Sequence, residues 1–123
     1  MLHLLLAMAL MSTWNEKTPD LRHFQWKNRV LLLFTPSKTD AVLKKQTALV
    51  EAHSAGFEER DLIVFVVPDH APLWERFQVD ARTFTVVLIG KDGGEKFRQT
   101  SLLEPEKLFQ IVDSMPMRRA GER

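Results

Sequence analysis

Polar side chains that could bind a ligand lie next to three apolar stretches of the chain. They carry hydroxyl groups, positive charges and an imidazole, and they are Thr35, Ser37, Lys38, Thr39, His70, Arg82 and Thr83. We call this set the polar rim. Hydroxyl groups, cations and the free N–H groups at the start of a helix are the donors that bind small anions. If these segments meet, the sequence predicts a site for sulfate, phosphate or a carboxylate. The alternative is a row of ordinary polar loop residues at strand ends.

Other kinds of chemistry are excluded or disfavoured. The chain contains no cysteine, which excludes thiol catalysis, disulfides and thiolate metal sites. The four histidines lack the spacing of metal ligands, so we expect no metal and no other cofactor. His53 falls on the apolar stripe of a predicted helix, which is typical of a packed core histidine. A triad of Ser37, His70 and Asp69 is disfavoured because adjacent residues cannot easily form the bond that orients the base. Residues 90–96 lack the order of a phosphate-binding loop.

Length and charge narrow the class of protein. The chain has 123 residues, which suits one domain. Seventeen Lys and Arg residues stand against sixteen Asp and Glu residues, so the formal charge is +1. Nucleic-acid-binding domains usually carry a strong basic excess on one face, and we expect no nucleic-acid partner here.

The first residues are apolar. Leu2 to Met11 is too short for a membrane span, which needs roughly 20 apolar residues, but has the length of a signal-peptide core. We therefore expect no transmembrane segment and favour export to the periplasm or the outside of the cell. The predicted organisation is a signal or apolar segment at 1–14, a domain at 15–119 and a tail at 120–123. The alternative is an apolar segment retained on a cytoplasmic domain.

The hydrophobic pattern predicts alternating strands and helices. Apolar runs at 30–34, 62–67 and 83–89 indicate buried strands, and 95–99 indicates a polar edge strand. Ser37 and Asp40 have capping-box spacing, so a helix is expected to start there and run to about Ser54, with Gly56 near its C-cap. A short helix is expected within 69–77, a hairpin turn at 91–94 and a last helix from Pro105 to Pro116.

Several short motifs resemble one known family. The residues that carry the resemblance are Trp26, Arg29, Arg60, Asp61, Gly90, Lys91, Asp92, Gly93, Asp113, Met115, Pro116 and Arg118. Over about residues 20–119 they are similar to a bacterial domain-of-unknown-function family, with related domains in sushi-repeat proteins of the animal extracellular matrix. The resemblance implies a thioredoxin-like and peroxiredoxin-like α/β fold, and bacterial members commonly carry a signal peptide. The order of predicted elements agrees with that fold: a βαβ–ββα three-layer sandwich around a four-stranded mixed sheet.

A comparison with peroxiredoxins bears on activity. They place Thr-x-x-Cys after the first strand of the motif and keep an arginine near the start of a later strand. Thr39 and Val42 are similar in spacing, with Val42 where the cysteine would fall, and Arg82 is a plausible match for the arginine. We therefore favour a non-enzymatic binding module for a protein or a small anionic ligand. A non-thiol enzyme or small-anion sensor that uses the polar rim is the alternative.

The sequence generates one prediction about activity. Purified protein should catalyse neither disulfide reduction nor peroxide reduction, because a thiolate is the attacking group in both reactions. Insulin-reduction and peroxide-consumption assays measure this directly. Turnover above the buffer rate would contradict it.

Overall fold

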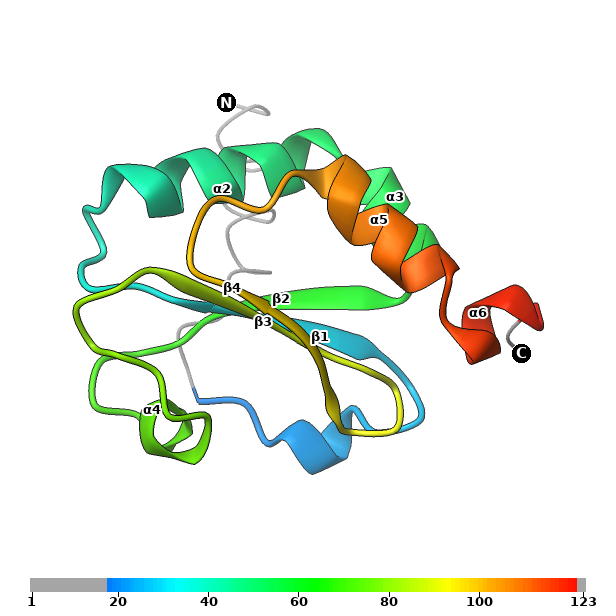
Figure 1. Ribbon diagram of the computed structural model, residues 1–123, viewed down its shortest axis with the longest axis horizontal. Helices are drawn as coiled ribbons and strands as arrows, with labels where there is room; N and C mark the ends of the chain where they lie inside the picture. Colours follow the sequence, from blue (N-terminus) through cyan, green and yellow to red (C-terminus); the bar gives the residue numbers. More distant parts are fainter. Residues whose placement is uncertain (1–17, 122–123) are drawn as a thin grey trace, which may run out of the picture.

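A computed structural model describes residues 18–121 and contains one mixed sheet (Figure 1). The strands are β1 (Arg29–Phe34), β2 (Leu62–Val66), β3 (Thr85–Ile89) and β4 (Glu95–Gln99), in the order β2-β1-β3-β4. β1 pairs with β2 in parallel and with β3 antiparallel, and β3 pairs with β4 antiparallel. The predicted α/β fold with a four-stranded mixed sheet is thus confirmed.

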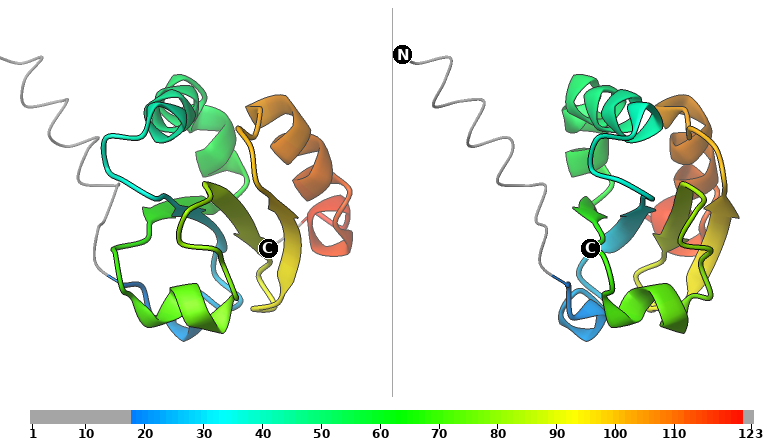
Figure 2. Two further views of the ribbon diagram at one scale, coloured as in Figure 1. Left: turned by 60° about the vertical axis from the view of Figure 1, so that its left-hand side comes forward. Right: turned by 90° about the vertical axis from the view of Figure 1, so that its left-hand side faces the viewer.

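Helices cover both faces of the sheet (Figures 1 and 2). They are η1 (Leu21–His23), α2 (Ala41–Ala52), α3 (Ser54–Glu59), α4 (Pro72–Arg76), α5 (Pro105–Asp113) and α6 (Pro116–Arg119). α2, α3 and α5 lie over one face, while η1 and α4 lie over the other. This arrangement gives the three layers that the order of elements predicts. None of the helices between residues 18 and 121 is both long enough and apolar enough to cross a membrane.

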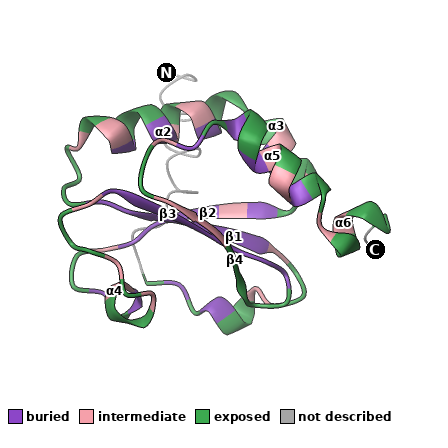
Figure 3. Cartoon of the chain, viewed as in Figure 1, coloured by how far each residue is buried: buried purple, intermediate pink, exposed green. Residues whose placement is uncertain are grey.

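β1 is the centre of both cores. All six of its residues are buried, and the five from Val30 to Phe34 are apolar (Figure 3). Because successive side chains of a strand point to opposite faces, Leu31 and Leu33 pack beneath α2 and α5, whereas Leu32 and Phe34 pack against α4. A continuous apolar run is the pattern of a strand that is covered on both sides.

The first helix begins and ends differently from the prediction. Asp40, not Ser37, is its N-cap, and the Asp40 carboxylate accepts a hydrogen bond from the Val42 N–H at 3.2 Å. The expected run to Ser54 is broken at His53, which lies between the end of α2 and the start of α3. Gly56 lies inside α3 rather than at a C-cap. A Cβ atom on Gly56 would stand 2.6 Å from the Phe109 ring, so glycine lets α3 and α5 approach closely.

Other boundaries shift for local reasons. His53 is exposed and not in the core, with its ring Nδ1 2.8 Å from the Leu49 carbonyl oxygen. β3 starts at Thr85, two residues later than expected, because residues 80–83 form a turn that the Thr83 N–H closes on the Asp80 carbonyl. The hairpin is confirmed, with Gly93 at φ +90°. Pro116 opens a further short helix, α6. The predicted apolar segment at 1–14 lies outside the described residues.

Candidate functional site

A surface pocket opens at the carboxyl ends of β1 and β2. Its volume is about 620 Å³, and it lies between the loop after β1, the loop after β2 with α4, and the turn before β3. The lining residues are Thr35, Pro36, Asp69, His70, Ala71, Pro72, Trp74, Glu75 and Ala81. The carboxyl ends of parallel strands are the usual binding edge of such sheets. The predicted position of a site therefore coincides with a real hollow.

The polar rim only partly reaches this pocket. Thr35 and His70 line it, and Thr35 is buried while His70 is exposed. Lys38 and Arg82 are exposed and belong to loops beside the pocket, as do the remaining hydroxyl residues of the rim. His70 also adopts φ +62°, a left-handed conformation that few non-glycine residues adopt, although histidine is among those enriched in it.

Hydroxyl groups of the rim bond one another and the local backbone. Thr35 Oγ1 donates to the Ser37 carbonyl at 2.7 Å, and the Ser37 and Thr39 hydroxyl oxygens are 2.9 Å apart. The start of α2 already holds the Asp40 carboxylate as its cap, which also lies 3.4 Å from Thr35 Oγ1. A negative charge therefore occupies the helix end that the sequence assigned to an external anion.

Arg82 pairs with Asp80, a residue of its own loop. Its backbone N–H donates to Asp80 Oδ1 at 2.8 Å, and its guanidinium pairs with the same carboxylate at 3.3 Å. These contacts, the backbone bond first, lower the pKa of Asp80. The Arg82 side chain is 90% exposed, so this arginine forms a surface pair and not a wall of the pocket. Anion binding at the rim stays a prediction that this charge arrangement does not support.

Sequence reasoning missed most of the pocket wall, including the polar side chains of Trp74 and Glu75. Trp74 is half-buried, and its indole N–H donates to the Pro68 carbonyl at 2.9 Å. Its ring also meets the Phe34 ring edge-on, with centroids 5.0 Å apart. Glu75 is the next residue of α4 and is exposed. The only sequence signal for either residue was the predicted short helix, which does not say which of its faces borders a site.

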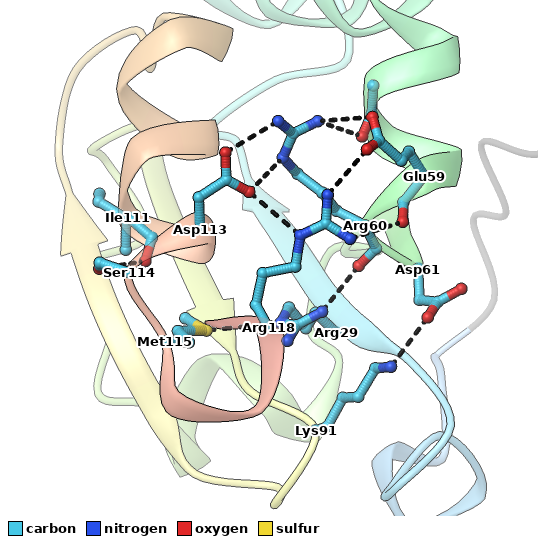
Figure 4. Close-up of polar contacts among 11 residues, drawn as sticks. Arg29, Glu59, Arg60, Asp61, Lys91, Ile111, Asp113, Ser114, Met115 and Arg118 are labelled. Carbon is cyan, nitrogen blue, oxygen red and sulfur yellow. Dashed lines mark hydrogen bonds and ion pairs between the residues drawn. The ribbon is translucent and has the colours of Figure 1, made fainter. Parts of the chain in front are cut away.

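The family-like motif gathers at the opposite end of the sheet. We call the charged residues drawn in Figure 4 the charged network: Arg29, Glu59, Arg60, Asp61, Lys91, Asp113 and Arg118. Arg29 and Leu62 are paired at the starts of β1 and β2, whereas the pocket follows Phe34 and Val66. The two polar regions are thus separated by the length of β1, about 17 Å.

Asp113 is the hub of the charged network. Arg60 donates to both of its carboxylate oxygens, at 2.9 and 3.0 Å, and Arg118 donates to one of them at 3.2 Å (Figure 4). Arg118 also pairs with Glu59 at 3.0 Å. The Arg60 guanidinium lies 4.1 Å from the centroid of the Phe109 ring. These contacts fasten α5 and α6 to the end of α3.

Two buried cations complete the network. Arg29 is 1% exposed, and its guanidinium donates to the Arg60 carbonyl at 2.9 Å and to the Met115 sulfur at 3.4 Å. Lys91 is 7% exposed and pairs with Asp61 at 2.8 Å. The Lys91 carbonyl accepts from the Trp26 N–H at 2.6 Å, while the Trp26 side chain is exposed. The motif residues thus join the sheet, the hairpin and the last helices.

The remaining motif residues shape the hairpin and α6. Asp92 accepts from the Gly94 N–H at 2.9 Å and pairs with Lys96 at 2.7 Å. Gly90 lies where a Cβ atom would be 2.6 Å from the Lys96 side chain.

Within residues 18–121, no group of three or more His, Asp or Glu side chains is placed to hold a metal ion.

Comparisons with known proteins agree with this geometry. The family model described as "Domain of unknown function (DUF4174)" matches residues 20–74 and 67–121, so the chain belongs to this family. The sushi repeat-containing protein SRPX of Rattus norvegicus is 25% identical, and the match covers 80% of this chain and 25% of that protein. The chain therefore spans about a quarter of the length of this relative.

Solved structures share the fold. The reduced 2-Cys peroxiredoxin of Plasmodium vivax has a TM-score of 0.69 at 15% identity, covering 81% of this chain and 84% of its own. Desulfothioredoxin of Desulfovibrio vulgaris Hildenborough has a TM-score of 0.59 at 17% identity, covering 80% and 91%. The protein is thus a cysteine-free DUF4174 domain with a thioredoxin-like fold.

The charged network makes the free energy of unfolding depend on pH. The Arg60 guanidinium, followed by that of Arg118, lowers the pKa of Asp113. A lowered folded-state pKa adds stability above the unfolded value of about 3.9 and loses it as the pH falls through the folded value. Because the Asp113 side chain is 46% exposed, we expect Asp113→Asn to cost only about 1 kcal/mol at neutral pH.

Urea unfolding at several pH values measures this effect. The difference between wild type and Asp113→Asn should begin to shrink as the pH drops below about 4, where the carboxylate of the unfolded chain becomes protonated, and should stop shrinking below the lower pKa of the folded state. Glu58→Gln, an exposed change on α3, serves as the control. A difference that stays constant down to strongly acidic pH would show that the Asp113 charge is not the source.

Proposed function

We propose that this domain is a non-catalytic binding module and that its ligand occupies the pocket between Thr35, Ala71 and Ala81. Redox proteins of this fold act through a cysteine beside the same edge of the sheet. By the Thr-x-x-Cys spacing, Val42 stands where that cysteine would fall, in the first turn of α2 and half-buried against the core. This edge of the sheet has a hollow, but the chain offers no thiol nucleophile beside it.

The exposure of the polar groups is the observation that carries this proposal. Catalytic acids and bases need surroundings that shift their proton affinity, which usually means burial beside a charged partner. Asp69, His70 and Glu75 at the pocket are all exposed, and the nearby Arg82 is held by Asp80. Solvated groups around a hollow favour recognition of a ligand over turnover.

A panel of blocked tripeptides, Ac-Ala-X-Ala-NH2 with X varied over all side chains, tests the binding role. At least one member should shift the backbone amide resonances of Thr35, Ala71 and Ala81 in a two-dimensional NMR titration. Ala81→Trp should abolish those shifts, because Ala81 lines the pocket and is exposed, so that a bulky side chain fills the hollow without disturbing the core.

Ala120→Trp is the matched control, since Ala120 is also exposed but lies after α6 at the other end of the sheet. It should leave the titration unchanged. The proposal is wrong if no tripeptide perturbs the pocket amides, or if Ala81→Trp and wild type respond alike.

We also propose that the protein is exported. The support is the apolar run Leu2–Met11, followed by a polar break at 15–20, together with the signal peptides implied by the family resemblance. Residues 1 to about 14 should be removed during export. Mass spectrometry of protein isolated from its native host measures the N-terminus, and an intact Met1 on cytoplasmic protein would contradict the proposal.

A further inference from the structure

We infer that the pocket selects positively charged groups carried on an aliphatic stem, such as a lysine or arginine side chain of a partner or a free alkylamine. This rests on the proposed function, and it reverses the sign of charge that the sequence suggested. The carboxylates of Asp69 and Glu75 line the hollow. Among the lining residues that the structure describes, none is a lysine or an arginine.

The charges beside the pocket have both signs. Lys38, in the loop after β1, is exposed and does not line the hollow. Arg82 does not offset the two carboxylates, because Asp80 holds its guanidinium and backbone N–H. Behind Thr35 lies Asp40, whose carboxylate caps α2. A cleft bordered by one sign of charge concentrates ions of the opposite sign and repels ions of the same sign.

Walls of the pocket suit an aliphatic stem. Pro36, Ala71, Pro72 and Ala81 line the hollow together with Asp69 and Glu75 and have short apolar side chains. Trp74 adds an indole that is held by its bond to the Pro68 carbonyl and by its contact with Phe34. Long cationic side chains bury their methylene stems on such surfaces while the charge stays near water, and an aromatic wall adds attraction for the cation.

A small anion is disfavoured by the same contacts. The Val42 N–H, which an anion at the start of α2 would use, donates to Asp40. The Thr35 hydroxyl donates to the Ser37 carbonyl, and the Ser37 and Thr39 hydroxyls bond each other. An incoming anion would have to break these bonds and approach two carboxylates.

Four tripeptides separate charge from shape: Ac-Ala-X-Ala-NH2 with X as lysine, arginine, norleucine or glutamate. NMR titration at low ionic strength should rank lysine and arginine at least about fivefold tighter than norleucine, with glutamate weakest. The doubly substituted Asp69→Asn/Glu75→Gln protein should bind the arginine peptide about threefold to tenfold more weakly. Its amide spectrum reports that it is folded.

The matched control is the double substitution Glu58→Gln/Glu106→Gln. It also removes two negative charges, but from exposed positions on α3 and α5. It should change the affinity for the arginine peptide by less than about twofold. n-Propylguanidine, which is the arginine side chain without its backbone and carries the same single positive charge as the blocked peptide, distinguishes the sources. Equal affinity for n-propylguanidine and the peptide points to a small free cation, and tighter peptide binding points to a polypeptide partner.

The inference is overturned if norleucine or glutamate binds as tightly as arginine, or if the double substitution and its control behave alike. If neutral and charged tripeptides bind the pocket equally tightly, the proposed binding function stands and only the charge selectivity is wrong. Absence of binding by every tripeptide would remove both.

Discussion

The burial of β1 on both faces is the constraint on which this structure depends. A six-residue strand with apolar side chains on both sides needs a helical layer above and another below. Those layers are α2, α3 and α5 on one side and η1 and α4 on the other (Figure 2). Polar groups are then confined to the two ends of the strand. The pocket follows Phe34, and the charged network surrounds Arg29.

Arg29 shows which partners a charged group needs when it is buried at the end of β1. Its guanidinium is almost fully removed from water, and a buried charge is costly unless its donors find partners. The Arg60 carbonyl and the Met115 sulfur accept from it. Both acceptors come from distant segments, so satisfying Arg29 also fixes where α3 ends and where α5 gives way to α6. The family resemblance rests largely on these residues, and their physical role is to hold the domain together at this end.

The sequence predicted the fold well because the buried strands of this fold are continuous apolar segments. Apolar runs at 30–34 and 62–67 predicted the buried strands β1 and β2, which span Arg29–Phe34 and Leu62–Val66, and Asp92–Gly93 predicted the hairpin. Element ends were harder, since Ser37 and Asp40 are both good caps. In the structure Asp40 caps α2, whereas the Ser37 hydroxyl bonds Thr39. The pocket was predicted in position but not in composition. Which face of α4 borders the hollow depends on packing against Phe34, and that contact leaves no local pattern.

Charge pairing explains why the rim differs from its expected chemistry. Arg82 and Asp80 are two residues apart, and the turn between them brings the carboxylate to the guanidinium more readily than any external anion. Asp40 likewise reaches the start of α2 before any ligand does. Local partners, close in sequence and already ordered, lose little entropy on pairing. A cation or a helix end near a predicted site therefore favours anion binding only when no carboxylate of the same loop competes. Arg82 and the start of α2 each have such a competitor, and Asp69 and Glu75 are the acidic residues that line the pocket.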